Sequence, residues 1–161
     1  MRRALLLAWC CSICAAAEAT QARYTIGVTA FADDNTVYHG SAGGAVRVYL
    51  SRHWSVEPEY LFLGEILGNH YDHVIWGNFA YDFRDRQRRV IPYWFGSPGV
   101  ITGVDRILGR RLVHAAVAAS TGVGTRVFVS ERWFVAPQVR AGAASGVFVE
   151  ATVSFGYAWR R

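Results

Sequence analysis

Apolar and polar residues alternate along most of this chain with a period of two. The alternation is clearest near the end, where one face carries Val147, Val149, Ala151, Val153, Phe155, Tyr157 and Trp159. A period of two is typical of a strand with one buried face, whereas an amphipathic helix repeats its apolar residues at i, i+3, i+4 and i+7. Beyond residue 19, no long stretch has the helical spacing. The pattern therefore predicts an all-β fold.

Eight segments follow this alternation. They span residues 23–31, 40–51, 54–63, 71–83, 89–99, 113–129, 133–141 and 146–159. Several are longer than the ~5–6 residues of most soluble strands and reach the ~9–11 residues with which a tilted strand crosses a bilayer. The connections at 52–53, 84–88 and 131–132 are mostly tight turns, whereas the intervening loops at 32–39, 64–70 and 100–112 are longer. Only the last intervening loop, at about 142–145, is short. Short turns on the periplasmic side and longer loops on the other are typical of outer-membrane barrels.

An internal repeat supports a count of eight strands. Residues 47–59 match residues 126–138 at a constant offset of 79 residues, and each copy reads as a strand, a tight turn and a returning strand. Two sets of four strands predict an eight-stranded antiparallel up-and-down barrel, although the two sheets of a sandwich would fit the same count. Pro58 and Pro137 count against a continuous ladder, since proline has no N–H to donate, and we expect an unpaired carbonyl or a bulge there.

The beginning of the chain differs from the rest. Two arginines precede an apolar run that ends in a small-x-small motif at residues 17–19, the pattern of a secretory signal peptide. We therefore expect a signal peptide over residues 1–19, cleaved after Ala19 or after Ala22, and an outer-membrane β-barrel over residues 20–161. All three cysteines lie in the signal segment, so disulfides and thiolate metal sites are excluded from the barrel.

All basic residues apart from histidine are arginines. The 17 arginines outnumber the 12 acidic residues, which gives a formal net charge of +5. Their densest run, residues 84–89, indicates a solvated turn near anionic lipid headgroups rather than a nucleic-acid patch, because an exported protein rarely meets nucleic acid. The expected partners are therefore outer-membrane lipid, the barrel-assembly machinery during insertion, and an unidentified surface partner through the loops. No nucleic-acid partner is expected.

Four segments resemble the bacterial outer membrane β-barrel domain family: residues 43–50, 76–83, 89–93 and 124–129. This group includes small barrels similar to outer membrane protein X and the membrane domain of outer membrane protein A. The resemblance covers essentially the whole mature chain and implies a transmembrane barrel in the bacterial outer membrane, without implying a reaction. Such barrels usually end on an aromatic residue that the assembly machinery reads, whereas Arg160 and Arg161 follow Trp159 here.

The outward face of the predicted barrel is apolar. It comprises Val46, Val48, Leu50, Trp54, Val56, Tyr60, Phe62, Val127, Val129, Trp133, Val135 and Val139. At the turn-side edge we expect an aromatic girdle of Trp54, Trp133, Tyr157 and Trp159, and at the loop side a second belt with Phe31, Tyr60 and Phe62. A soluble sandwich would need a mainly polar exterior instead.

The enclosed face carries the charge, at Arg47, Glu57, Glu59, Asp82, Arg126, Arg140 and Glu150. Hairpin register places Arg47 opposite Glu57 and Arg140 opposite Glu150. Because an eight-stranded lumen is only wide enough for side chains, we expect these charges to form a structural plug rather than an ion path.

Two histidine motifs could carry chemistry. His39-Gly40-Ser41 has the His-x-Ser spacing of a weak base–nucleophile pair, and barrels that modify lipid A use such groups, but this spacing arises easily by chance. His70 and His73 flank Asp72 and could bind a metal, yet on a strand they face opposite sides. We therefore expect no catalytic, cofactor or metal site and no enzymatic activity.

The expected function is that of an integral outer-membrane barrel with a structural or surface-interaction role and a side-chain-filled, non-porin lumen. One alternative is a soluble exported barrel that binds a small ligand, similar to a lipocalin; a calyx of that kind is polar outside and apolar inside. The second alternative is an outer-membrane enzyme that modifies lipid A.

Overall fold

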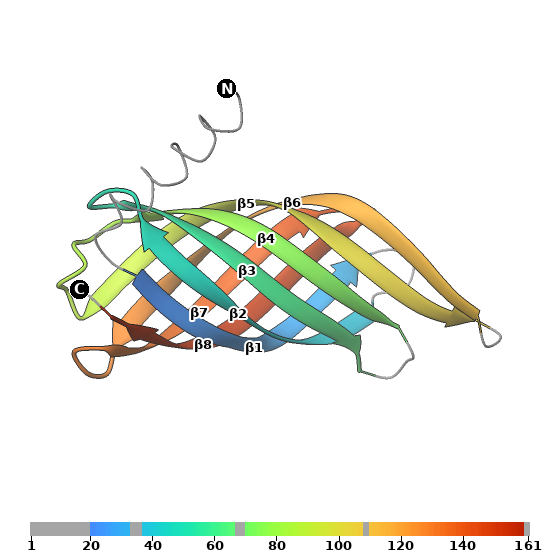
Figure 1. The fold of residues 1–161 in the computed structure, drawn as a ribbon, viewed down its shortest axis with the longest axis horizontal. Helices are drawn as coiled ribbons and strands as arrows, with labels where there is room; N and C mark the ends of the chain where they lie inside the picture. The colour runs from blue at the N-terminus through green and yellow to red at the C-terminus, as the bar shows by residue number, and fades with distance from the viewer. Residues whose placement is uncertain (1–19, 33–36, 67–69, 108–109, 160–161) are drawn as a thin grey trace, which may run out of the picture.

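The computed structural model of this chain describes residues 20–32, 37–66, 70–107 and 110–159. They form β1 (Thr20–Ala32), β2 (Val37–Tyr49), β3 (Trp54–Glu65), β4 (Tyr71–Asp82), β5 (Val90–Ile107), β6 (Arg110–Phe128), β7 (Trp133–Ala143) and β8 (Val147–Ala158). Each strand pairs antiparallel with its sequence neighbours, and β8 pairs with β1, so the sheet closes into a barrel (Figure 1). The predicted eight-stranded up-and-down barrel is confirmed. The expected signal peptide and the two final arginines lie outside the described residues.

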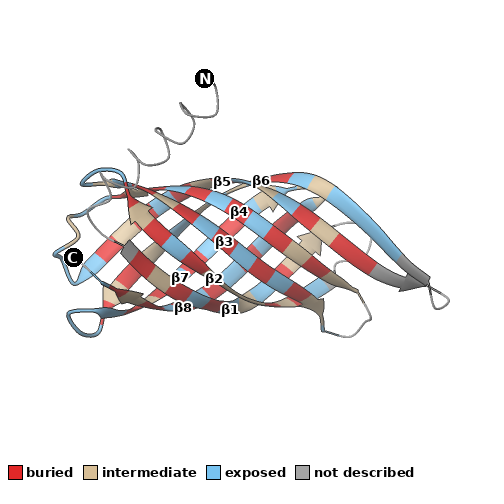
Figure 2. Cartoon of the chain, in the orientation of Figure 1, coloured by how far each residue is buried: buried red, intermediate tan, exposed pale blue. Residues whose placement is uncertain are grey.

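Burial alternates along the strands as the sequence predicts (Figure 2). In β8, buried and exposed residues alternate along almost the whole strand. The outward residues are apolar, whereas much of the enclosed face is polar. Among the described residues, no helix is long and apolar enough to cross a membrane.

The sequence repeat is also a structural repeat. In the first copy the N–H of Leu50 donates to the carbonyl of Trp54 at 2.9 Å, and in the second the N–H of Val129 donates to the carbonyl of Trp133 at 2.9 Å. A serine hydroxyl accepts the N–H of each tryptophan, at 3.2 Å in the first turn and 3.1 Å in the second. The two copies therefore form the same tight turn at the same end of the barrel.

Proline interrupts the ladder without shifting its register. Between β2 and β3, pairing runs to Ala45 opposite Glu59 and resumes at Val48 opposite Val56. The equivalent gap between β6 and β7 lies beside Pro137, and a third, between β4 and β5, lies beside Pro98. Of the two outcomes expected at the repeat prolines, the ladder therefore shows a local gap, and the constant register on both sides leaves no place for a bulge.

The predicted loop at residues 100–112 is wrong. β5 continues to Ile107, β6 begins at Arg110, and their register runs unbroken from Val90 opposite Val127 to Ile107 opposite Arg110. Pro98-Gly99 reads as a turn signal in the sequence, but both residues stay in the ladder. The result is a long β5–β6 hairpin that projects beyond the other strands, at the end opposite to the start of β1 and the end of β8 (Figure 1).

The lumen contains layers of different chemistry. Toward the loop end, an apolar layer comprises Leu61, Leu63, Val74, Trp76, Ile101, Ala118 and Phe148. Toward the turn end, a second apolar layer comprises Ile91, Phe128, Phe134, Ala136 and Ala158. Between the two layers lies a network of charged side chains, and above the first layer, at the loop end, lies a group of histidines.

Candidate functional site

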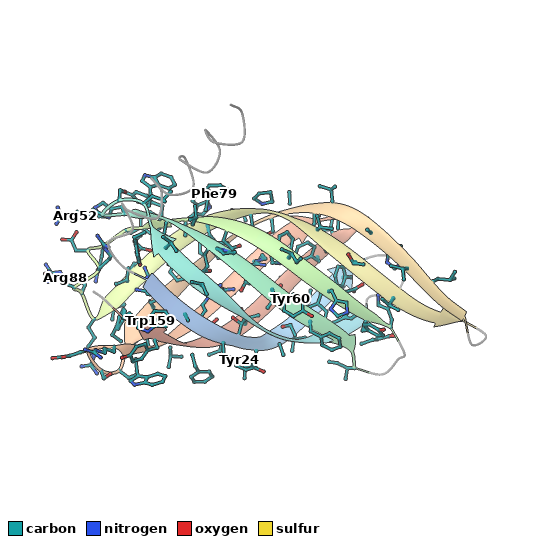
Figure 3. All side chains as sticks on the ribbon, viewed as in Figure 1. Tyr24, Arg52, Tyr60, Phe79, Arg88 and Trp159 are labelled. Atoms are coloured by element: carbon teal, nitrogen blue, oxygen red, sulfur yellow. The ribbon has the colours of Figure 1, made fainter. Side chains whose placement is uncertain are left out.

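The turn-side edge of the outer face carries the four aromatic residues of the expected girdle. Trp54, Trp133 and Trp159 are about half exposed, at 48%, 57% and 54%. The ring centroids of Trp133 and Tyr157 lie 5.1 Å apart, and those of Tyr157 and Trp159 lie 5.8 Å apart. Figure 3 shows Trp159 at the same end as the turn residues Arg52 and Arg88. Amphipathic rings in this position suit the boundary between hydrocarbon and lipid headgroups.

Phe31 does not belong to the second aromatic belt, so that expectation is wrong for this residue. Tyr60 and Phe62 face outward and are exposed, but Phe31 packs inside the lumen with its ring 5.6 Å from that of Phe148. The odd-numbered positions of β1 face inward, as the buried Thr29 shows, and Phe31 continues that row.

Arg23 joins strands from all around the lumen. Its Nη2 donates to Oε1 of Glu57 at 2.7 Å and to Oε1 of Glu59 at 2.9 Å. Its Nη1 donates to Gln138 at 2.9 Å and to Ser154 at 2.7 Å. One guanidinium from β1 thus bonds β3, β7 and β8. Charge-assisted hydrogen bonds of this kind are the strong ones in a low-dielectric interior.

The two repeat-related arginines converge on one carboxylate. Arg47 Nε donates to Glu57 Oε2 at 2.6 Å, and its Nη1 lies 3.5 Å from Oδ1 of Asp82. Arg126 Nη2 donates to Oδ2 of the same Asp82, and the Tyr49 hydroxyl donates to that oxygen at 2.9 Å. Asp82 is therefore held by both copies of the repeat.

Arg140 and Glu150 are opposite in register, but they do not form the expected ion pair. Arg140 Nη2 instead reaches across the lumen to Oε2 of Glu59 at 2.5 Å. Asn78 Nδ2 donates to the same oxygen at 3.0 Å. Oε1 of Glu150 is buried without a hydrogen-bond partner among the described residues. Glu59 thus accepts from Arg23 through Oε1 and from Arg140 through Oε2.

This network closes the middle of the barrel. It contains four arginines and three carboxylates, all almost fully buried: Arg23, Arg47, Arg126, Arg140, Glu57, Glu59 and Asp82. The equally buried Glu150 lies opposite Arg140 in register. The space that Arg23, Arg47, Glu57 and Arg126 line has no room for a water molecule. A hollow of about 1190 Å³ has Ile26, Val28 and Val139 in its lining, on the apolar exterior, where lipid rather than solvent would fill it.

Sequence reasoning missed Arg23 and the two tyrosines of the network. The Tyr93 hydroxyl donates to Gln138 at 3.0 Å, and the Arg47 guanidinium lies 4.7 Å from the centre of the Tyr93 ring. Arg23 begins the first predicted strand, and an extension of the β1 alternation would have placed it inward beside Thr25. Its partners, however, lie across the lumen.

The arginine-rich turn 84–89 forms an exposed group at the turn end. Arg52 donates from Nε and Nη2 to the two carboxylate oxygens of Asp85, both at 2.6 Å. This hydrogen bonding holds the pKa of Asp85 below its usual value. Because both side chains are exposed, solvent screens the pair and its contribution to stability is small.

The histidine motifs are rearranged at the loop end. His39 and Ser41 both face the lumen, and the Ser41 hydroxyl has no hydrogen-bond partner among the described residues. His70 and His73 separate as the strand period predicts: His70 Nε2 contacts Asp72 at 3.0 Å inside, while His73 meets the Tyr60 hydroxyl outside at 2.7 Å. The structure adds His39 to the inner group: His39 lies opposite Glu65 in the β2–β3 register, and the N–H of Glu65 donates to the carbonyl of His70 at 3.0 Å.

Comparison with known proteins identifies solved barrels of the same fold. No protein-family model and no curated protein matches the chain. The N-terminal barrel domain of Pseudomonas aeruginosa OprF superposes with a TM-score of 0.74 at 12% identity, covering 89% of this chain and 98% of that domain. Neisserial surface protein A gives 0.72 at 12% identity, covering 86% and 95%. Ail of Yersinia pestis gives 0.60 at 11% identity, covering 88% and 97%.

The lipid-facing surface agrees with this likeness. Backbone groups in a bilayer must be paired within the protein, which a closed barrel achieves, and the side chains that face lipid must be apolar or interfacial. Exposed Val28, Ile75 and Val139 satisfy that condition in the middle of their strands, and Figure 3 shows Tyr24 and Phe79 pointing away from the barrel. The chain therefore has the fold of the small eight-stranded transmembrane β-barrels of bacterial outer membranes, and its apolar exterior suits contact with lipid.

Proposed function

We propose that this barrel has a structural or surface-interaction role in the outer membrane and does not act as a pore. The observation that carries the proposal is the mid-lumen network, where Arg23, Glu57 and Glu59 bond one another across a space too small for water. An ion path would need a continuous file of water or mobile ions.

The barrel-assembly machinery remains the proposed partner for insertion, with Tyr157 and Trp159 as the aromatic signal in and after β8.

Planar-bilayer recording tests the closed lumen. The purified barrel should add no steady ionic current to the bilayer. A double variant, Arg47→Ser with Glu57→Ser, removes both members of one ion pair and leaves the net charge unchanged, so it should open space and conduct more than the wild type. Steady single-channel steps from the wild-type barrel would contradict a closed lumen.

The β5–β6 hairpin is the proposed surface element. β5 and β6 have 18 and 19 residues, whereas the other strands have 11 to 13. The sequence of its tip contains Arg106, Arg110 and Arg111 against Asp105, a positive balance that favours an anionic surface partner. Ail, a barrel of the same fold, has been solved in complex with the heparin analogue sucrose octasulfate.

Trypsin treatment of intact cells tests the orientation of this hairpin. The chain has no lysine, and its loop-end segments contain no arginine other than those three. If the hairpin projects outward, trypsin should cut the protein only between β5 and β6. Replacement of the three arginines by glutamine should abolish the cleavage. Cleavage at the arginine-rich turn 84–89 in intact cells would reverse the proposed orientation.

The absence of enzymatic activity is also part of the proposal. His39 and Ser41 are buried in the lumen rather than exposed at the lipid-facing rim, with 3% and 5% of their surface accessible. A lipid A substrate approaches from the membrane, so it would not reach them. His39→Ala should leave the mass spectrum of lipid A unchanged in cells that express the barrel.

The lipocalin-like alternative is not favoured, because a lipocalin is polar outside and apolar inside. This barrel has an apolar exterior and a largely polar lumen.

A further inference from the structure

Metal-ligating side chains from four strand regions meet at the loop end of the lumen. His39 comes from β2, Glu65 from the end of β3, His70 and Asp72 from the start of β4, and His114 from β6. All five line a cavity of about 330 Å³. This cavity lies above the apolar layer, away from the arginine network, so it belongs to neither the plug nor the lipid face.

The distances in this group are close to those of a coordination sphere. His70 Nε2 lies 3.0 Å from Oδ1 of Asp72, and His39 Nε2 lies 3.9 Å from Oδ2. One ligand atom from each of His39, His70 and Asp72 can be chosen so that all lie within 4.8 Å of one another. Ligands around tetrahedral zinc, with bonds of about 2.0–2.1 Å, lie about 3.3 Å apart. Small side-chain rotations would therefore bring the three atoms onto one ion.

His39 provides the independent sign of a ligand. Its side chain is buried, with 3% of its surface accessible, and neither ring nitrogen has a hydrogen-bond partner among the described residues. A buried polar group without a partner is costly, and native proteins rarely leave one unexplained. The ring packs edge-on against Phe31 at 5.2 Å and against His70 at 5.6 Å. A bound cation would give its Nε2 a partner.

The surroundings support the same assignment. The N–H of His70 donates to Oε2 of Glu65 at 3.3 Å, which anchors one ligand through its backbone. The His114 ring stacks on that of His70 with centroids 5.8 Å apart. Gly103 permits this approach, because a Cβ at that position would overlap both the His114 imidazole and Oδ1 of Asp72.

We propose that this cluster is a binding site for a divalent transition-metal ion of the zinc class. His39, His70 and Asp72 are the ligands, and His114 is the nearest candidate for the fourth position. Two or three imidazoles with one carboxylate suit zinc and its neighbours, whereas calcium and magnesium prefer oxygen ligands alone. The proposal does not depend on the closed mid-lumen, because the apolar layer separates the two regions.

Calorimetric titration of the purified barrel with Zn²⁺ tests the site. One saturable site should appear, a chelator should reverse it, and Co²⁺ in its place should show the visible absorption of a four-coordinate centre. His39→Ala should weaken Zn²⁺ binding by at least about tenfold, as should Asp72→Asn, which preserves the shape of the side chain. The second variant decides the question if the first does not fold.

His73→Ala is the matched control. It removes a histidine from the same strand, one that faces outward and meets the Tyr60 hydroxyl, and it should leave the affinity unchanged. The proposal is overturned if the wild type shows no saturable Zn²⁺ binding. It is equally overturned if Asp72→Asn binds Zn²⁺ as tightly as the wild type, or if Mg²⁺ saturates the site at concentrations where Zn²⁺ does not.

Discussion

The middle and the loop end of the lumen are built by the same inward-facing alternation, yet they treat polar groups differently. In the middle, Glu59 accepts from Arg23, Arg140 and Asn78. At the loop end, both ring nitrogens of His39 lack partners among the described residues, and the surrounding side chains enclose about 330 Å³. Arg140 Nη1 and Glu150 Oε1 in the middle also lack partners among those residues, but the space beside Arg23 has no room for a water molecule, whereas the cavity beside His39 has room for an ion. The following changes should separate the two regions.

The largest effect is expected from Arg23→Met in the middle of the lumen. The substitution leaves Glu57 and Glu59 facing each other with fewer positive partners, and removal of one member of a buried ion network costs about 3–5 kcal/mol. Urea unfolding in detergent, followed by tryptophan fluorescence, measures the loss. A midpoint equal to that of the wild type would show that the network does not support the fold.

Glu59→Gln and Glu150→Gln should have different effects on the free energy of unfolding. Glu59 is bonded to two arginines, so loss of its charge should lower the free energy of unfolding by about 2–3 kcal/mol. Glu150 has an unpartnered buried oxygen, so its neutralisation should leave stability unchanged or raise it. The same urea unfolding measurement compares the two variants. An equal loss of unfolding free energy in both would indicate that Glu150 does pair with Arg140.

Two lumen-side glycines, Gly43 beside the apolar layer and Gly103 beside the histidine cluster, should respond differently to an added methyl group. A Cβ at Gly43 would overlap the backbone carbonyl of Tyr60, so Gly43→Ala should destabilise the barrel by about 1–3 kcal/mol. At Gly103 the three atoms nearest to such a Cβ belong to the His114 and Asp72 side chains, which can move aside. Gly103→Ala should thus unfold close to the wild type while its Zn²⁺ affinity falls; a reversed order would contradict this distinction.

Replacement of the unpartnered histidine should be tolerated by the fold. Without metal, His39→Leu removes two unsatisfied nitrogens beside Phe31 and should leave stability unchanged or raise it by up to about 1 kcal/mol. With Zn²⁺ present, the wild type should become the more stable of the two, since a ligand stabilises the state that binds it. Thermal unfolding with and without Zn²⁺ checks both halves, and a large loss in the metal-free form would make His39 a structural residue.

The smallest effect is expected at the exposed turn. Arg52→Gln should cause no measurable change in the unfolding midpoint at neutral pH, because solvent screens its pair with Asp85. The pKa of Asp85 is lowered in the fold, so whatever the pair contributes is present above the unfolded pKa and lost as the pH falls through the folded one. Wild type and variant should therefore converge in acid. If the difference between their unfolding midpoints instead widened in acid, the Arg52–Asp85 pair could not be the cause of that difference.

More of the fold than of the lumen's side-chain contacts could be predicted from the sequence. Alternation assigns each side chain to a face, and hairpin register joins Arg47 to Glu57, because both depend on neighbours along the sheet. Contacts across the lumen depend on the stagger with which the barrel closes, which no local pattern records. That is why the partner of Arg140 and the role of Arg23 were not predictable. His39 and His70 meet through their shared neighbour Glu65 in the β2–β3–β4 register, but the sequence pattern assigned all three residues to loops.

The ladder gaps beside the prolines have a consequence for how the barrel stays closed. All three lie between strands that a tight turn joins at one end. The closing pair, β1 and β8, has no such turn, and its ladder runs without interruption from Gln21 opposite Ala158 to Ala32 opposite Val147. A turn keeps two strands at high effective concentration even when part of their pairing is missing. The chain thus confines its weak pairing to strands held by covalent connection and keeps continuous hydrogen bonding for the seam that lacks it.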